Sequence, residues 1–427
     1  MFRGLKGSKM KAAEKTESRS RISVHEAETI ILSYARPMPS VDCPLEAAAG
    51  RLLRENLVAD RDFPPFDRVT MDGIAVRAET VKAGIRRFRI HGTQAAGAPR
   101  MTLSDSSGCI EVMTGAMLPN GTDCVIRVED VHVNGHEARI HDEAEAEPLQ
   151  FVHRKGSDYR SGDLLVPAGR ALNAPLIAIC ASLGKSSVLV ADEPRIAVVA
   201  TGDELVPVDT LPDAHQIRMS NPYAIAAALG QRGYSRLEIV HVADDTGRMI
   251  DLLGGALSRN DVIVISGGVS AGKFDLVPSV LARLGVDELF HRVLQRPGLP
   301  LWFGAASGSK VVFALPGNPV SSLVSTIRYV LPFLAARRMG TAGLDSSAPT
   351  EFAVLAEEYA FEPELTLFLP VALDASTDGS TRAHPQPVHG SGDFARLSES
   401  AGFIELPARE RHFPRGSAWP LYRWSPR

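Results

Sequence analysis

Between Pro194 and Gly340 the sequence alternates between short apolar runs and longer stretches with helical features. The runs RIAVVATGDE, LEIVHVADD and DVIVISGGVS are rich in valine, isoleucine and alanine and end in small or acidic residues. Such runs are typical of strands covered on both faces, as in a parallel sheet flanked by helices. The pattern therefore predicts a central parallel α/β domain over residues 194–340.

Capping residues place two helix starts. Ser23 and the glutamate three residues later have capping-box spacing, so a helix is expected from Ser23 to about Ala35. Inside the α/β region, Ser220 supplies an N-cap ahead of a proline in the first turn, and Gly233 is expected to end that helix.

The segments on either side of the α/β region have different residue patterns. Residues 59–152 contain short mixed runs broken by glycine and proline, which predicts a mostly β insertion. The tail over 342–427 alternates without a strong helical period and predicts a small β domain. Residues 1–21 carry seven Lys or Arg against two Glu and few apolar side chains, so we expect a disordered tail.

Composition excludes several classes of protein. The formal net charge of -4 provides no basic stripe for a phosphate backbone, so nucleic acid is not an expected partner. No apolar run reaches the ~18 residues that a membrane span needs, and the charged N-terminus lacks the apolar core of a signal peptide. The widely spaced cysteines (Cys43, Cys109, Cys124, Cys180) indicate reduced thiols in a cytoplasmic protein.

Small-residue loops follow the expected strands. They are Thr201-Gly202-Asp203-Glu204, Ser266-Gly267-Gly268-Val269-Ser270 and Pro316-Gly317-Asn318-Pro319, and a fourth run ends at Asp244. Ligands of open parallel sheets bind outside the carboxyl ends of the strands, so these loops are expected to converge on one site for a phosphorylated ligand. Carboxylates of Glu204, Asp244 and Asp275 beside a phosphate require a cation, which predicts magnesium.

Two other motifs overlap at the second loop. Gly268-Val269-Ser270-Ala271-Gly272 matches the nucleophile elbow of a serine hydrolase, with His384, His389 and His412 available later in the chain. Those histidines fall in the separate β tail, which disfavours this alternative. A Walker A pattern also ends here, but Phe274 replaces the hydroxyl residue that would bind magnesium.

The sequence resembles the MoeA family, which includes the E domain of gephyrin, from about Ser23 to the C-terminus. The resemblance is carried by FPPFDRVTMDGIAVR, EVMTGAMLPNGTDCVI, HRKGSDYRSGDLLVPAG, VVATGDELV, SNPYAIAAAL, VISGGVSAGKFDLVP, RPGLPLWFG and VVFALPGNPVSS. It implies four parts: a split N-terminal domain over 22–58 and 153–193, the inserted β-rich domain over 59–152, an α/β domain over 194–340 similar to the molybdopterin adenylyltransferase fold, and a C-terminal β-barrel over 342–427.

The resemblance also implies an activity, that of a molybdenum insertase. The family cleaves adenylylated molybdopterin, releases AMP and places molybdenum from molybdate on the dithiolene sulfurs of the pterin, with Mg²⁺ as the expected cofactor. A homodimer is implied, in which the β-rich insertion packs over the site. Molybdopterin adenylyltransferase and the chaperones of molybdoenzymes are further expected partners.

Site residues carry over by motif. The expected catalytic residues are Asp72, Thr114, Asp158, Glu204, Asp244 and Asp275. The expected substrate-binding residues are Thr201, Gly202, Asn221, Gly267, Gly268, Ser270, Arg296, Pro316, Gly317, Asn318, Pro319 and Ser321. Magnesium is expected on Asp244, Asp275 and Ser270.

One departure from the family bears on function. Where much of the family has Lys-Pro-Gly-Lys-Pro, this chain has Arg296-Pro297-Gly298-Leu299-Pro300. Arginine keeps a cation that can bind an oxyanion, whereas Leu299 removes one. A scaffold or carrier that binds molybdopterin without inserting the metal is therefore an alternative. The set of acidic residues favours the enzyme, because a binder needs no such cluster.

Overall fold

The computed structural model describes residues 19–269, 276–339, 351–386, 390 and 392–426. The chain separates into two compact units. The first unit comprises Met1–Val41 with Ala191–Arg427, and the second unit comprises Asp42–Val190. Each is described by itself below.

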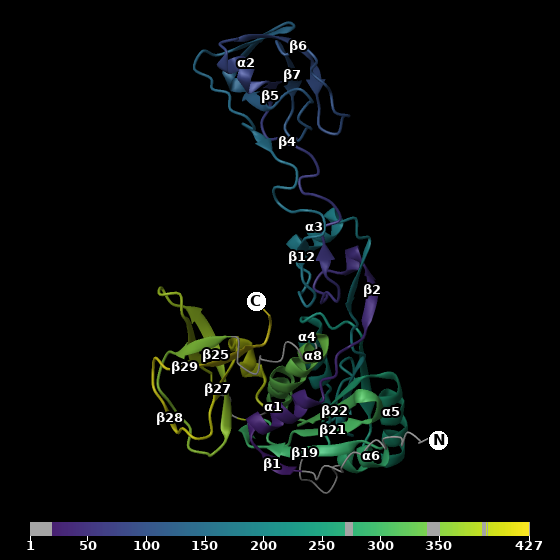
Figure 1. The fold of residues 1–427 in the computed structure, drawn as a ribbon. Helices are drawn as coiled ribbons and strands as arrows, with labels where there is room; N and C mark the ends of the chain where they lie inside the picture. The colour runs from purple at the N-terminus through teal and green to yellow at the C-terminus, as the bar shows by residue number, and fades with distance from the viewer. Residues whose placement is uncertain (1–18, 270–275, 340–350, 387–389, 391, 427) are drawn as a thin grey trace, which may run out of the picture. The chain divides into compact units, whose positions relative to one another are not determined.

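The first unit is built on a seven-stranded sheet, visible in the lower part of Figure 1. Its strands, in spatial order, are β1 (Arg19–Ile22), β19 (Asp287–Val293), β21 (Trp302–Ala306), β22 (Lys310–Leu315), β18 (Val262–Ser266), β14 (Ile196–Thr201) and β17 (Leu237–Val242). The expected parallel arrangement is confirmed for β17, β14, β18 and β22. Strand β21 runs antiparallel to both neighbours, because the short turn Ser307–Ser309 joins it directly to β22.

Helices cover both faces of this sheet, which is why its strands read as continuous apolar runs. On β14, Ile196 and Val198 belong to one hydrophobic core, and Ala197 and Val199 belong to the other. The first core also takes side chains from α1 (Val24–Ser33), α4 (Asn221–Gly230) and the helix Pro319–Met339. The second core takes them from α5 (Thr246–Arg259) and α6 (Val277–Arg283).

The helix Pro319–Met339 consists of α7 (Pro319–Ser325), a π-helical turn η4 (Thr326–Val330) and α8 (Leu331–Met339). Its length and apolar composition would suffice to cross a membrane. Most of its residues are instead buried in the core of the first unit.

Both predicted helix starts are found, with differences in detail. Ser23 and Glu26 form the expected capping box, and the helix ends at Ser33 rather than near Ala35. Ser220 occupies the N-cap position of α4, but its side chain makes no capping hydrogen bond. Helix α4 ends at Gly230, ahead of the turn that contains Gly233.

Two expectations for the N-terminus are corrected. Residues 19–21 were expected in a disordered tail, but strand β1 pairs with β19 in parallel, from Arg19 opposite Phe290 to Ile22 opposite Val293. Edge pairing supplies backbone hydrogen bonds that composition does not reveal. Residues 22–41, expected in the split domain, belong to the first unit because Val24, Ala27 and Ile31 are buried in its core. Figure 1 shows their helix, α1, beside the sheet of this unit.

The C-terminal part of the first unit is the expected β-barrel. Five strands close on themselves through the pairing of β25 with β27: β25 (Thr366–Ala375), β26 (Thr381–Pro385), β23 (Phe352–Leu355), β29 (Ala418–Arg423) and β27 (Gly402–Leu406). A short strand from the α/β part, β20 (Gln295–Arg296), pairs in parallel with β25. The barrel and the α/β part thus share the segment that carries Arg296.

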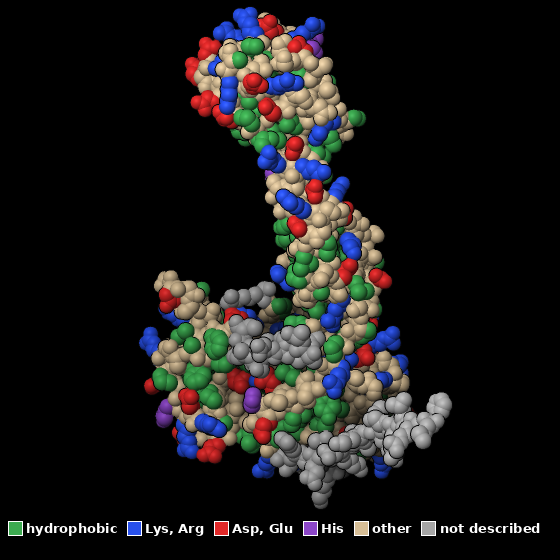
Figure 2. All heavy atoms as spheres, viewed as in Figure 1, with side chains coloured by type: hydrophobic (Ala, Val, Ile, Leu, Met, Phe, Trp, Pro, Cys, Tyr) green, Lys and Arg blue, Asp and Glu red, His purple; other side chains and the backbone are tan. Residues whose placement is uncertain are grey.

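The second unit contains the expected β-rich insertion. A six-stranded sheet comprises, in spatial order, β8 (Cys124–Arg127), β5 (Gly73–Val76), β7 (Gly108–Val112), β6 (Arg87–Gln94), β10 (Glu137–Ile140) and β9 (Val131–Asn134). Two further pairs, β3 (Leu57–Val58) with β12 (Leu164–Val166) and β4 (Arg68–Val69) with β11 (Val152–His153), join stretches far apart in the sequence. On the face drawn in Figure 2, basic and acidic side chains lie interspersed over this unit.

All four cysteines are buried and free, in agreement with the expected thiols. Burial raises the pKa of Cys109 and of Cys124 to about 12. It also raises the pKa of Cys180.

Candidate functional site

A pocket of about 1070 Å³ in the first unit lies where four strands of the sheet end. Thr201 of β14 pairs with Val242 of β17, and Ser266 of β18 pairs with Leu315 of β22, so the loops after these strands begin at one level. The expected residues among its lining are Thr201, Gly202, Glu204, Asn221, Asp244, Gly267, Gly268, Arg296, Pro316, Gly317, Asn318, Pro319 and Ser321. Sequence reasoning thus found the loops that meet, while the role of each residue stays a prediction.

Two expected residues, Ser270 and Asp275, lie outside the described part of the chain. The described loop before them is closely packed. Gly267 has φ 106°, and a Cβ there would lie 2.6 Å from the Thr201 carbonyl oxygen. Gly268 has φ 67°, and its Cβ would lie 2.6 Å from Cγ2 of Val277. Glycine is required at both positions by backbone conformation and by space.

Asn221 connects two of the pocket loops. Its Nδ2 donates to Oγ of Ser266 at 2.8 Å and to the carbonyl oxygen of Gly317 at 2.7 Å. Asn221 is the first residue of α4, so the start of this helix is tied to the ends of β18 and β22. An amide that donates both hydrogens to neighbouring loops fixes their spacing.

The acidic side of the pocket presents oxygen donors. The hydroxyl of Thr201 donates to Oδ1 of Asp244 at 3.3 Å, and Glu204 lines the same space. Among the described residues, no three His, Cys, Asp or Glu side chains are grouped closely enough to form a metal cage. Magnesium requires no such cage, because it commonly uses one or two carboxylates together with substrate phosphates and waters. The donors present fit that mode of binding.

The opposite wall of the pocket was missed from the sequence. It comes from the barrel and from the segment that β20 begins, and its residues include Gln295, Tyr359, Phe361, Leu365, Leu367 and Leu369. The guanidinium of Arg296 lies 6.0 Å from the centre of the Phe361 ring, a cation–π distance. Leu299 also lines this wall. The aromatic residues of the tail were the available signal, but no spacing rule connects them with loops of another domain.

The three remaining expected residues belong to the second unit. Asp72 and Thr114 are in direct contact: Oδ1 of Asp72 accepts from the Thr114 backbone N–H at 2.6 Å and from its hydroxyl at 2.8 Å. These two hydrogen bonds lower the pKa of Asp72. Nε2 of His153 lies 2.8 Å from Oδ1 of Asp158. The other ring nitrogen of His153 lies 3.1 Å from Nη2 of Arg68.

The serine hydrolase alternative gains no support from the described histidines. His384 lies on barrel strand β26, 3.0 Å from Asp374, and His412 lies on strand β28 (His412–Phe413). Neither lines the pocket. His389 and Ser270 lie outside the described residues.

Family models match most of the chain. Residues 22–184 match the "MoeA N-terminal region (domain I and II)", residues 197–336 a "Probable molybdopterin binding domain", and residues 353–422 the "MoeA C-terminal region (domain IV)". The second match contains the loops that line the pocket, and the third contains its barrel wall.

Curated relatives are similar over nearly their full length. A molybdopterin molybdenumtransferase from Synechocystis is 40% identical over 404 residues, which are 94% of this chain and 100% of that protein. The molybdopterin molybdenumtransferase of Staphylococcus epidermidis is 29% identical and covers 94% of this chain and 95% of its own.

A solved structure agrees with the fold. The molybdopterin biosynthesis MoeA protein of Pyrococcus horikoshii is 29% identical, with a TM-score of 0.79, over 95% of this chain and 100% of that one.

Proposed function

The chain belongs to the MoeA family, and we propose on this premise that it is a molybdenum insertase, which transfers molybdenum to molybdopterin in molybdenum cofactor biosynthesis. The observation that carries the proposal is the pocket, where loops from four strand ends meet an arginine, Arg296, and a set of oxygen donors. The similarity to molybdopterin molybdenumtransferases over 94% of the chain supports the enzyme over a carrier.

The substrates are adenylylated molybdopterin and molybdate, and the products are AMP and the metallated pterin. Gly267 and Gly268 line the pocket without a side chain, which suits a phosphate held by backbone N–H groups. Arg296 supplies a guanidinium for the oxyanion. The apolar side chains of the barrel wall lower the polarity of the same space, which would strengthen these polar contacts.

Magnesium is proposed as the cofactor. Asp244 and the Thr201 hydroxyl would hold it, together with Asp275 and Ser270 of the following loop. When bound, it would neutralise negative charge on the phosphoanhydride. Asp244 keeps its carboxylate oriented through Thr201 and through its own backbone N–H, which donates to Asp203 at 2.9 Å.

The proposal also includes the location, the oligomeric state and the partner proteins of the enzyme. We infer a cytoplasmic homodimer, and Asp72, Thr114 and Asp158 of the second unit are proposed as further catalytic residues. Molybdopterin adenylyltransferase would supply the substrate, and molybdoenzyme chaperones would receive the product. The support is the family resemblance of the motifs that carry these residues.

The test measures AMP release and the molybdenum content of the pterin product. Purified protein is incubated with adenylylated molybdopterin, molybdate and Mg²⁺, and with EDTA in a parallel sample. We expect both products from the wild type, none with EDTA, and AMP release lowered about a hundredfold in Asp244→Asn. Asp245→Asn is the matched control, since Asp245 caps α5 by accepting from the backbone N–H of Arg248 at 2.8 Å, a role that asparagine also fills.

Each result has a distinct meaning. Metallated product from the wild type, with loss only in Asp244→Asn, supports the insertase and the role of this carboxylate. Pterin binding without metallated product would instead identify a carrier. Full activity in the presence of EDTA would remove magnesium from the proposal while leaving the transferase in place.

A further inference from the structure

A buried hydrogen-bond chain connects the helix Pro319–Met339 with the pocket. The hydroxyl of Tyr329 donates to Oε1 of Gln295. Nε2 of Gln295 in turn lies 3.2 Å from the carbonyl oxygens of both Pro297 and Gly298. The Gln295 and Tyr329 side chains are each only 1% exposed. The hydrogen-bond chain therefore ends on the segment Arg296–Leu299, which lines the pocket.

The direction of each bond follows from the groups present. Carbonyl oxygens only accept, so the amide nitrogen of Gln295 must face Pro297 and Gly298. This leaves Oε1 as the acceptor for the Tyr329 hydroxyl. Burial raises the pKa of Tyr329 well above its usual value, so the hydroxyl keeps its proton. Every donor of the Gln295 amide is used on the pocket segment.

The pocket segment also rests on the helix itself. Gly298 has φ 94°, and a Cβ there would lie 2.7 Å from Nε2 of Gln295 and 3.0 Å from Oγ of Ser325. Ser325 is the last residue of α7 and is fully buried. The main chain at Gly298 thus approaches the helix as closely as a residue without a side chain allows.

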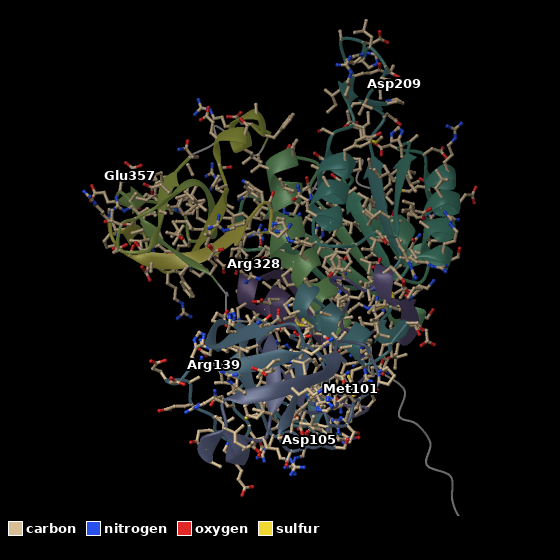
Figure 3. All side chains as sticks on the ribbon, turned by 90° about the horizontal axis from the view of Figure 1, so that it is seen from above. Met101, Asp105, Arg139, Asp209, Arg328 and Glu357 are labelled. Carbon is tan, nitrogen blue, oxygen red and sulfur yellow. The ribbon has the colours of Figure 1, made fainter. Side chains whose placement is uncertain are left out.

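Tyr329 is held in place by its neighbour. It lies in the π-helical turn η4, and π-helical turns occur frequently at functional sites. The adjacent Arg328 forms ion pairs with Glu28 of α1 at 3.0 Å and with Glu405 of β27 at 2.8 Å. Figure 3 shows Arg328 where the helix meets the barrel. The turn that carries Tyr329 is therefore fixed to both the α/β part and the barrel.

Packing alone does not account for this pair. A phenylalanine and a methionine would fill similar space without the cost of burying a hydroxyl and an amide. The polar pair instead holds the carbonyls of two residues that lie between Arg296 and Leu299. We propose that Gln295 and Tyr329 are positioning residues that hold the segment Arg296–Leu299 in the shape that binds the oxyanion substrate. This inference rests on the proposed insertase function.

The test compares Tyr329→Phe, Gln295→Met and the double variant with the wild type. We expect Tyr329→Phe to raise KM for molybdate about tenfold, the size expected from the loss of one buried hydrogen bond, with kcat changed less than about twofold. Gln295→Met should raise KM at least as much, because it also removes the hydrogen bonds to Pro297 and Gly298. The double variant should lose no more than Gln295→Met alone, because that change already breaks every link of the hydrogen-bond chain. Tyr329→Phe alone leaves the buried Oε1 of Gln295 without a donor, which could prevent folding, whereas the double variant removes this oxygen. The double variant therefore keeps the test valid if that single variant fails to fold.

The matched control is Tyr234→Phe. Tyr234 is also buried in the first unit, at 4% exposed, but lies away from the pocket lining. Tm is measured for all variants. A purely structural role predicts that KM for molybdate stays unchanged when Tm falls, as in the control, and that result would overturn the proposal.

Equilibrium dialysis with molybdate alone separates this inference from the proposed function. If the wild type binds molybdate but produces no metallated pterin, the insertase function fails. Weaker molybdate binding in Tyr329→Phe and Gln295→Met would still uphold the positioning role. Unchanged binding in these variants overturns it, and so does the absence of molybdate binding in the wild type, whereas the insertase function is decided by the metallated product.

Discussion

Asp72 accepts two hydrogen bonds from a single residue, Thr114, whose backbone N–H and hydroxyl both reach Oδ1. The two residues are far apart in the sequence, and Asp72 immediately precedes β5 while Thr114 follows β7, its partner in the sheet. Hydrogen bonds to the ionised form lower the pKa of the Asp72 carboxyl. The second unit therefore presents this group as a carboxylate over a wide range of pH.

Thr114→Val should raise the pKa of Asp72 without restoring its ordinary value, because the backbone N–H still donates. The stabilisation from a lowered pKa is present above the ordinary value and is lost as the pH falls through the lowered one. The variant should therefore lose this stabilisation at a higher pH than the wild type. NMR titration of the Asp72 carboxyl carbon measures the shift. Thr114→Ser, which keeps the hydroxyl, should match the wild type, and equal pKa values in all three proteins would contradict the assignment.

Arg328→Met should lower the free energy of unfolding of the first unit by about 3–5 kcal/mol, because it leaves Glu28 and Glu405 without their buried cation. Tryptophan fluorescence during denaturant unfolding measures this, since Trp302, Trp419 and Trp424 all lie in the first unit. Arg411→Met is the control, because its ion pairs are exposed and should contribute less than about 1 kcal/mol. Equal losses in the two variants would show that burial gives Arg328 no special weight.

Gly268→Ala should reduce kcat/KM about a hundredfold, because the added Cβ would displace the pocket loop from Val277 and Thr201. Gly285→Ala is the matched control: its φ of 78° imposes a similar strain, but no atom lies within 4 Å of its added Cβ. Both variants should lose about 1–2 kcal/mol of stability from the backbone conformation. Comparable activity in the two would mean that the packing of Gly268 is unimportant for the reaction.

Leu299→Lys should lower KM for molybdate at least about fivefold, since it adds a cation to a wall that already contains Arg296. Leu299→Met controls for the change of shape. Steady-state kinetics at varied molybdate concentration measures the effect, which should weaken as salt is added. No gain over the methionine variant would indicate that Arg296 already supplies the charge that the oxyanion needs.

The sequence was sufficient for much of the fold and for one side of the pocket. Valine and isoleucine runs that end in Thr201, Asp244, Ser266 and Pro316 place their loops at one sheet edge by a general rule of parallel strands. The barrel was expected from the resemblance, and the β-rich insertion from its broken, alternating texture. These inferences depend on local residue patterns or on short motifs, which can be read directly from the amino-acid sequence.

Contacts between distant segments could not be predicted in this way. Strand β1 forms because β19 offers it a free edge, and β21 reverses because of the tight turn to β22. The Phe361 wall depends on the docking of the barrel against the α/β part, and the pair of Gln295 with Tyr329 depends on the docking of β20 against the helix Pro319–Met339. No periodicity or motif encodes such a docking, so these residues became visible only in the structure.

The burial of the cysteines has a consequence for a protein that handles a dithiolene. A thiol exchanges with other sulfur compounds as its thiolate, and burial holds Cys109 and Cys124 in the protonated form, with pKa values of about 12. All four cysteines are enclosed by protein. We therefore expect these enclosed thiols to react slowly with a ligand whose reactive atoms are sulfurs, and mixed disulfides between enzyme and pterin are not expected.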